Sequence, residues 1–250
     1  MAVLILSSFT PAWATLKETP IEPAQKKLEV GEELVFDVRW MGIPIGTGVL
    51  KVLEKTLIAG QECFHVLALA KTNEALSTLF PVNDEVHSFI DAAHWRSLEF
   101  RKKLSEGRYR ADEKVVYDYP EKKGFFESVR NKSKEAFAAP ASAQDFLSAF
   151  YWFRTQDIKV GKCVRTVIND KGKSWDLEID ILKREIKELR GGRVMDSVLV
   201  EPKTSYNGVL YNRGRVWVYV TADSRRVPFW VKIATPFGPV VGVLRVKEAA

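Results

Sequence analysis

The strongest constraint on the fold is a series of short segments in which apolar and polar side chains alternate. The first runs from residue 33 to residue 41, and its apolar side carries Leu34, Phe36, Val38 and Trp40. Alternation with period two, in aromatic and β-branched residues, is typical of half-buried strands. Similar runs of four to nine residues, separated by turn-like residues, recur along most of the chain. We therefore expect a mainly β protein, built on a large curved antiparallel sheet or a half-open β-barrel.

One segment, residues 142–156, departs from this alternation. Its aromatic and small side chains recur at the spacing of a helix face, at Phe146, Ala149, Phe150 and Phe153. Ser142, followed three residues later by Asp145, resembles the start of a helix. The pattern predicts one amphipathic helix with an aromatic face, which packs on the sheet.

Two stretches, 48–52 and 242–246, have similar sequences, GVLKV and GVLRV. The similarity predicts two strands with equivalent roles, near each other where the sheet curls. The first stretch overlaps the end of GIPIGTG, which precedes a strand and lacks the lysine of a phosphate-binding loop. We interpret this glycine-rich segment as a turn or bulge between strands.

Length and composition are those of an ordinary globular domain, with 250 residues of which 46% are hydrophobic and 28% charged. We expect a single β-rich domain over residues 31–247, preceded by a polar lead-in over 15–30. After residue 14, no stretch approaches the roughly 18 uncharged apolar residues of a membrane-spanning helix. The chain is therefore not expected to span a membrane.

The first fourteen residues, MAVLILSSFTPAWA, have the pattern of an export signal. A short apolar run is followed by Ala12-Trp13-Ala14, which places small residues three and one before a cleavage point. No lysine or arginine precedes the run, so the N-terminal basic region of a Sec-type signal would be missing. We expect cleavage between Ala14 and Thr15 and a mature protein in the periplasm. The alternative is a frayed hydrophobic N-terminus.

The net charge is +6, with 38 basic residues scattered among 32 acidic ones. The longest basic run, Arg101-Lys102-Lys103, is too short to indicate a nucleic-acid-binding site. We expect a solvated charged surface and no nucleic-acid partner.

The two cysteines, Cys63 and Cys163, each begin an apolar run that resembles a strand. In an oxidising periplasm, a disulfide between the two strand starts is one expectation. Two separate thiols are the other. The chain contains no C-x-x-C, so neither a redox motif nor a zinc motif is present.

The local motifs of the common enzyme classes are absent from the sequence. It contains no G-x-S-x-G, no P-loop and no H-E-x-x-H, and His65, His87 and His94 have no recognised metal-ligand spacing. We predict a non-enzymatic protein with no catalytic residue, no cofactor and no resident metal.

The segment WDLEIDIL carries the sharpest pattern of charge, with Asp176, Glu178 and Asp180 on one side of a predicted strand. Three carboxylates could bind a hard cation if other oxygens joined them, as in a metal-dependent hydrolase. They could equally pair with lysine or arginine on the neighbouring strand. The simplest interpretation is a solvent-facing side opposite a buried one.

Aromatic residues gather in the predicted helix and in the C-terminal strands. An exported β scaffold lined in this way could hold an acyl chain or another apolar ligand. We predict that the ligand-binding groove is lined by Phe146, Phe150, Phe153 and an inward-facing Trp40. Arg225 and Arg226 are predicted rim residues that would favour an anionic head group.

The order of three motifs resembles a known family. These motifs are the segments 31–48, GEELVFDVRWMGIPIGTG, 150–154, FYWFR, and 216–244, which begins VWVYVTADSRRVPF. Together they are similar to the bacterial domain of unknown function family DUF3108, over about residues 29–247. The closing segment also resembles, more loosely, the strand–turn–strand of envelope lipoprotein carriers, whose curved half-barrel holds acyl chains.

The resemblance implies an exported, β-rich protein for which the family supplies no catalytic residues. With the aromatic pattern, it favours a protein that binds a lipid or a lipoprotein acyl chain in a curved sheet. The alternative is a structural or interaction module of the envelope, which binds another protein or the cell-wall polymer. A metal-dependent hydrolase is the third hypothesis.

Overall fold

The fold was obtained as a computed structural model, which describes residues 21–24, 28–189, 192–206, 209–210 and 214–245. The predicted cleavage site between Ala14 and Thr15 lies outside these residues. Among the described residues, no helix combines the length and apolar character needed to cross a membrane.

The first part of the described chain contains eight strands and a short helix. In chain order they are β1 (Glu33–Trp40), β2 (Ile43–Ile58), β3 (Gln61–Thr72), α2 (Glu74–Ser77), β4 (Asn83–Asp91), β5 (Ser97–Glu106), β6 (Tyr109–Asp118), β7 (Lys123–Ser128) and β8 (Ser133–Ala138). The second part contains β9 (Ala143–Gln144), α3 (Phe146–Arg154), β10 (Cys163–Asp170), β11 (Lys173–Glu188), β12 (Val194–Tyr206), β13 (Val209–Leu210), β14 (Val216–Thr221), β15 (Pro228–Thr235) and β16 (Gly238–Leu244).

The strands form one sheet in the order β8-β7-β6-β5-β4-β3-β2-β1-β16-β15-β14-β12-β11-β10-β9, with β13 beside β12. Neighbouring strands are antiparallel, except that β9 pairs with β10 in parallel. The sheet begins at β8 and ends at β9, which do not pair with each other, so the sheet curls without closing. The predicted mainly β fold with a curved sheet is confirmed.

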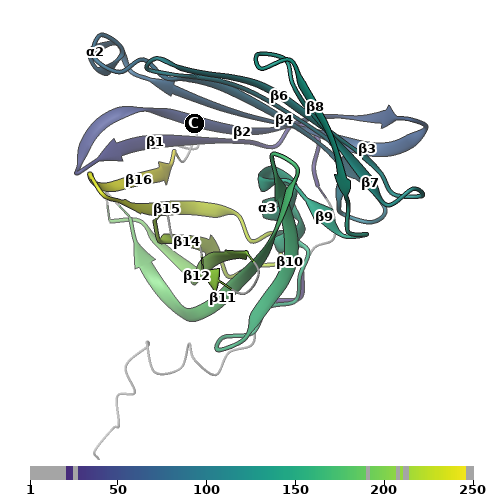
Figure 1. The fold of residues 1–250 in the computed structure, drawn as a ribbon. Helices are drawn as coiled ribbons and strands as arrows, with labels where there is room; N and C mark the ends of the chain where they lie inside the picture. The colour runs from purple at the N-terminus through teal and green to yellow at the C-terminus, as the bar shows by residue number, and fades with distance from the viewer. Residues whose placement is uncertain (1–20, 25–27, 190–191, 207–208, 211–213, 246–250) are drawn as a thin grey trace, which may run out of the picture.

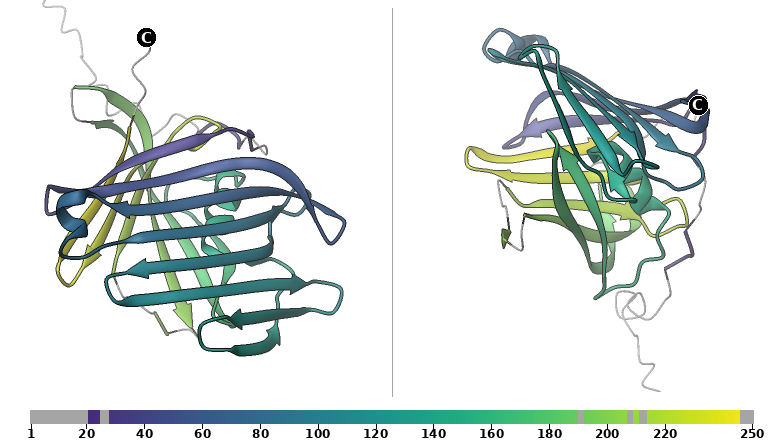
Figure 2. Two further views of the ribbon diagram at one scale, coloured as in Figure 1. Left: turned by 90° about the horizontal axis from the view of Figure 1, so that it is seen from above. Right: turned by 45° about the vertical axis from the view of Figure 1, so that its right-hand side comes forward.

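The sheet has two parts, on either side of β1 (Figures 1 and 2). The broad half consists of β2–β8, and the curved half consists of β9–β12 and β14–β16. Helix α3 lies between them, as Figure 1 shows. Its residues Ala149 and Phe153 pack with buried side chains of β10, β11, β12 and β14. On the opposite side of α3, Tyr151 packs with buried side chains of β2, β3 and β4.

The predicted helix is present, but it is shorter than 142–156 and has a different N-cap. Ala143 and Gln144 form β9 with β10, so helical dihedrals begin only at Phe146. Asp145 is the N-cap, and its carboxylate accepts the backbone N–H groups of Leu147 and Ser148 at 2.8 and 2.9 Å. The Ser148 hydroxyl in turn accepts the Asp145 N–H at 2.8 Å. Such a reciprocal arrangement satisfies the free amides at a helix start.

The two similar stretches at 48–52 and 242–246 flank the same strand, within the described residues. Gly48 pairs with Phe36 on one side of β1, and Gly242 pairs with Val38 on the other. A Cβ atom added at either glycine would lie within 4.0 Å of the Phe36 side chain. The prediction that these strands lie near each other in equivalent places is confirmed.

The glycine-rich segment is partly a turn and mostly the start of β2. Met41 and Gly42 form the turn, and a bulge in the β1–β2 pairing falls between Val38 and Arg39. A Cβ atom at Gly46 would lie 2.2 Å from the Lys71 carbonyl oxygen of β3, so the two backbones approach too closely for a side chain.

Candidate ligand-binding groove

An apolar groove lies between α3 and the inner face of the curved half. Its inner compartment has a volume of about 290 Å³. The lining includes Phe146, Phe150, Phe153, Leu177, Val200 and Val218, which come from α3, β11, β12 and β14. Pockets of roughly 300–1,000 Å³ with predominantly hydrophobic walls are typical of small-molecule sites.

The alternation along β14 explains why this wall is apolar. Val216, Val218 and Val220 line the groove. Their neighbours Trp217 and Tyr219 point to the other face of the sheet, because side chains alternate along a strand. On that face Tyr219 meets Trp230 at 5.4 Å between ring centroids. A single strand therefore supplies an aliphatic wall to the groove and aromatic side chains to the opposite face of the sheet.

A second compartment of about 710 Å³ adjoins the first and shares Phe146, Ile168 and Val216 with it. Its other walls carry Lys171, Lys173, Trp175 and Ile233. Half of the Phe146 surface is exposed, whereas Ile168 is buried. The groove thus has a mainly apolar inner end and an outer end that carries Lys171 and Lys173.

Of the predicted lining residues, the structure brings three together. Phe146, Phe150 and Phe153 all face the inner compartment. Trp40 does not line either compartment. It lies at the end of β1, where its indole N–H donates to the Phe237 carbonyl at 2.9 Å. That any of these residues contacts a ligand stays a prediction.

The two predicted rim arginines lie elsewhere, in the turn between β14 and β15. Arg226 is fully buried, and its guanidinium donates to the Glu22 carbonyl at 2.9 Å and to the Arg154 carbonyl at 3.3 Å. Burial lowers the pKa of Arg226. Arg225 pairs with Asp223 at 2.9 Å and lines a different cavity. The structure therefore places neither arginine at the rim of this groove: Arg226 is buried among backbone carbonyls, and Arg225 is exposed beside Asp223.

Lysines that the sequence analysis did not single out lie at the groove instead. Lys171 lies in the tight turn between β10 and β11, Lys173 begins β11, and Lys203 lies on β12. The sequence carries a turn signal, DKGK, but the position of that turn over the groove depends on the long-range pairing of β9 with β10. Lys203 pairs with Asp180 at 2.6 Å.

The cysteines are separate free thiols, so the predicted disulfide is wrong and the alternative is correct. Cys63 is buried on β3 in the broad half, where desolvation raises its pKa to about 11. Cys163 begins β10 in the curved half. The two strands belong to different halves of the sheet.

The carboxylates of WDLEIDIL mostly form cross-strand ion pairs. Glu178 pairs with Arg165 of β10 at 2.6 Å, and Asp180 pairs with Lys203 of β12 at 2.6 Å. This confirms, for these two residues, the expectation of pairing with neighbouring strands. Cys163 lies with Glu178 and Asp180 in a group whose ligand atoms are within 4.8 Å of one another, and Asp176 is not part of it. Both carboxylates of this group already have cationic partners.

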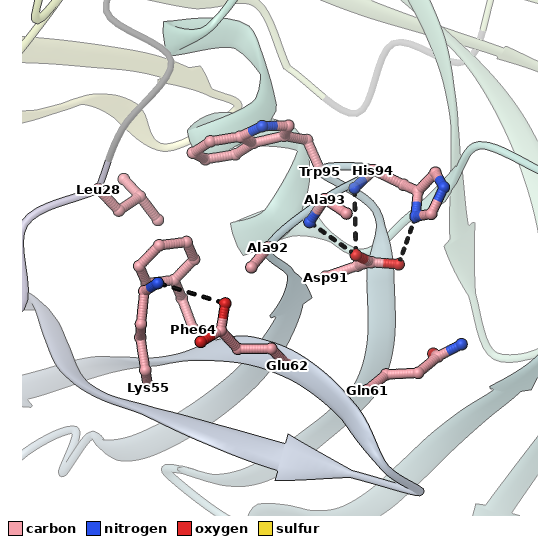
Figure 3. A pocket seen from close by; sticks show the side chains of 10 residues that line it. All are labelled: Leu28, Lys55, Gln61, Glu62, Phe64, Asp91, Ala92, Ala93, His94 and Trp95. Carbon is pink, nitrogen blue, oxygen red and sulfur yellow. Dashed lines mark hydrogen bonds and ion pairs between the residues drawn. The ribbon is translucent and has the colours of Figure 1, made fainter.

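A more polar pocket of about 460 Å³ lies in the broad half. Figure 3 shows Phe64 and Trp95 on one side of it and Asp91, bonded to His94, on the other. Burial would raise the pKa of Asp91, but hydrogen bonds from the amides of Ala93 and His94 and from the His94 ring lower it. Glu62 pairs with Lys55 at 3.3 Å. Because charged side chains line this pocket, it is less suited to an apolar ligand than the groove.

A histidine pair lies across β3 and β4. His65 Nε2 is 2.9 Å from His87 Nδ1, and His87 Nε2 is 2.7 Å from the Glu85 carboxylate. The His65 ring also stacks on Phe89, with 4.4 Å between ring centroids. Burial is the largest cause that lowers the pKa of His65; the charges of His87 and Arg101 act in the same direction, and Glu54 opposes them.

We expect acid to destabilise the wild type more than a His65→Gln variant. Because the folded-state pKa of His65 is depressed, its contribution to stability is present above the ordinary value of 6.5 and is lost as the pH falls through the folded-state value. Urea denaturation at pH 7 and pH 5 measures the difference. Equal losses of unfolding free energy in both proteins would contradict this assignment.

The structure is similar to the crystal structure of a beta-barrel-like protein of domain of unknown function DUF1849 from Brucella abortus. The TM-score is 0.58 at 11% identity, and the match covers 86% of this chain and 96% of that chain. At this identity the likeness shows the fold alone. A second match is to a Bacteroides fragilis protein with a YmcC-like fold that is proposed to be exported. It has a TM-score of 0.30 at 11% identity, covers 92% of this chain and 99% of that one, and carries no inference.

No curated protein matches the sequence. Residues 35–245 match the family described as a protein of unknown function, DUF3108. The matched residues run from β1 to the end of β16 and contain all three motifs that carry the resemblance in the sequence, apart from the first four residues of the first motif. The chain therefore belongs to the DUF3108 family.

Proposed function

We propose that this protein is an exported, non-enzymatic binding protein of the bacterial envelope, which holds the acyl chain of a lipid or lipoprotein between α3 and the curved half. One observation carries the proposal: a helix face of three phenylalanines closes an aliphatic wall into a groove. The fold-level analogy with lipoprotein carriers, whose half-barrel is covered by helices, points the same way.

The chemistry of the groove favours an amphiphile over a wholly apolar ligand. Methylene groups fit the inner compartment, where Phe153, Leu177 and Val200 are buried. The outer compartment carries Lys171, which pairs with Glu113 at 3.5 Å, and Asp170, which pairs with Lys102 at 3.3 Å. Lys173, also in its wall, forms no ion pair among the described residues. An anionic head group would therefore lie at the outer end, with its chain directed toward the inner end.

Export of the chain is supported by its N-terminal pattern. The apolar run and the A-x-A sequence before Thr15 are those of a cleaved signal. A periplasmic protein that binds acyl chains would protect them from water during transfer between envelope sites.

A Val218→Trp variant is expected to weaken acyl-chain binding at least tenfold, because the indole would occupy the inner compartment of about 290 Å³. The measurement is displacement of a fluorescent long-chain fatty acid by oleate. Leu199→Trp is the matched control: Leu199 pairs with Tyr219 on the outer face, whereas Val218 pairs with Val200 on the inner face. The control should retain the wild-type Kd within a factor of two. Val216→Trp, in the wider part of the groove, replaces Val218→Trp if the latter lowers the melting temperature.

Chain length provides a second readout of the same experiment. Each buried methylene contributes about 0.8 kcal/mol, so a fatty acid shorter by two methylenes should bind roughly tenfold more weakly. Equal affinity of Val218→Trp and wild type, or no dependence on chain length, would contradict the proposal and favour the alternative of an envelope interaction module.

A further inference from the structure

Three connections at one edge of the molecule carry large apolar side chains that are exposed. The turn between β1 and β2 exposes 62% of Met41, the segment after α2 exposes 83% of Leu79, and the turn between β15 and β16 exposes 81% of Phe237. Trp40, Ile43 and Phe80 beside them are also exposed. We call these six residues the apolar edge.

Hydrogen bonds join the three connections. Trp40 donates to the Phe237 carbonyl at 2.9 Å, and the Met41 N–H donates to the Pro239 carbonyl at 3.0 Å. Asn73, the N-cap of α2, donates to the carbonyls of Ile45 and Pro44 at 2.9 and 2.8 Å. In Figure 1 and in the left view of Figure 2, α2 and the two turns accordingly lie together at the left-hand edge. The exposure of these side chains is therefore built into the fold.

The neighbouring turn between β5 and β6 belongs to the same edge. Its Gly107 N–H donates to the Pro81 carbonyl at 2.8 Å, and a Cβ atom at Gly107 would lie 2.7 Å from the Phe80 ring. Tyr109, the first residue of β6, is 47% exposed between Arg108 and Arg110, and its side chain hydrogen-bonds Lys171. Aromatic and basic side chains thus alternate beside Phe80.

The basic side chains at this edge are held by neutral groups. Arg39 donates to the Gly42 carbonyl at 2.9 Å. Arg110 donates to the carbonyls of Gly107 and Tyr109 at 2.8 and 2.7 Å. A carbonyl carries no opposite charge, so among the described residues no ion pair neutralises these two guanidinium groups beside the turns. Arg108 and Lys71 are exposed beside them, and the exposed acid of α2 is Glu74.

This combination matches the interfacial region of a bilayer. Exposed apolar patches on soluble proteins commonly mark interaction sites. Tryptophan and tyrosine favour the level of the lipid head groups, and each nearby cation strengthens binding to an anionic membrane about fivefold. Side chains on separate tips can each enter a fluid bilayer, whereas a protein partner would have to match the spaces between the tips.

We propose that the apolar edge docks the protein onto a bilayer that contains anionic phospholipid. Ile233, which lines the outer compartment of the groove, lies four residues before Phe237, or about 13 Å along an extended strand. Docking would therefore place the groove near the membrane surface. That an acyl chain enters or leaves the groove at the membrane surface rests on the proposed function, whereas docking itself does not.

Vesicle flotation with the full chain tests the proposal. Wild type should float with vesicles of phosphatidylethanolamine and phosphatidylglycerol, more weakly with pure phosphatidylcholine, and less at high salt. A Leu79→Ser/Phe237→Ser variant should bind the anionic vesicles at least tenfold more weakly. The matched control is Leu57→Ser/Ile186→Ser, which removes two exposed apolar side chains of 65% and 48% exposure that lie outside the apolar edge.

The same proteins, assayed for fatty-acid displacement in solution, separate the two proposals. Leu79→Ser/Phe237→Ser should keep its fatty-acid Kd, and Val218→Trp should keep its flotation. If wild type fails to float, or if the control variant loses as much vesicle binding as Leu79→Ser/Phe237→Ser, the docking proposal is wrong. The proposal of an acyl-chain groove would not be affected. Flotation without any fatty-acid binding would overturn the groove and leave docking intact.

Discussion

Replacing Arg154 with methionine is expected to lower the free energy of unfolding by about 3–5 kcal/mol. Arg154 is 6% exposed at the C-terminal end of α3, and its guanidinium meets both carboxylate oxygens of Glu32 at 2.6 and 2.8 Å. Its Nε also donates to the Arg225 carbonyl at 2.9 Å. The substitution would leave the Glu32 carboxylate without its partner in a poorly solvated place, which is the costly way to break such a pair.

A double variant separates this cause from lost packing. Arg154→Met with Glu32→Gln removes the uncompensated charge as well, so most of the lost stability should return. Urea denaturation of the four proteins, wild type, each single variant and the double variant, gives the coupling free energy. A loss below about 1 kcal/mol in Arg154→Met would show that the pair does not hold α3 in place.

Replacing Asp145 with alanine is expected to lower the free energy of unfolding by about 2–4 kcal/mol. The variant would lose the N-cap and leave the hydrogen-bond donors that Asp145 accepts without a partner. Asp145 is fully buried, and its carboxylate accepts the Ser88 hydroxyl of β4 at 2.7 Å as well as two helix amides. It thus joins α3 to the broad half. Burial raises the pKa of Asp145, and the hydrogen bonds that it accepts oppose this effect.

Asp145→Asn is the matched variant, because its side-chain carbonyl can still accept the amides of the first helical turn. We expect it to lose much less stability than Asp145→Ala. Since α3 carries Phe146, Phe150 and Phe153, Asp145→Ala should also weaken fatty-acid binding. Thermal unfolding, monitored by circular dichroism, measures the stability of the variants. Fatty-acid displacement, at a temperature where each variant is folded, measures their binding. Equal stability of the two variants would show that the carboxylate has no capping role.

Local periodicity was sufficient to predict a mainly β chain and the aromatic face of the helix, but not the strands β8, β9 and β13. Phe146, Phe150 and Phe153 share one face because of their spacing, and they do so wherever the helix packs. The similarity between 48–52 and 242–246 indicated two equivalent neighbours, since both strands pair with β1.

Features that depend on long-range pairing could not be predicted in this way. Arg226 looks like a surface residue in the sequence, yet carbonyls of the N-terminal segment and of α3 surround it. Ser142 looks like a helix cap, but the pairing of the next residues with β10 moves the helix start to Asp145. Lys171 and Lys173 line the groove because of where the β10–β11 turn lies, and β10 is placed by its pairing with β9. Short sequence windows contain none of this information.

The most direct test of the central claim is mass spectrometry of lipids extracted from the protein after purification from its native bacterial envelope. Wild type and Leu199→Trp should each release about one acyl-containing molecule per chain, and Val218→Trp should release far less, because its indole fills the inner compartment. An empty wild-type protein, or the same yield from Val218→Trp, would contradict the account of an acyl-chain groove.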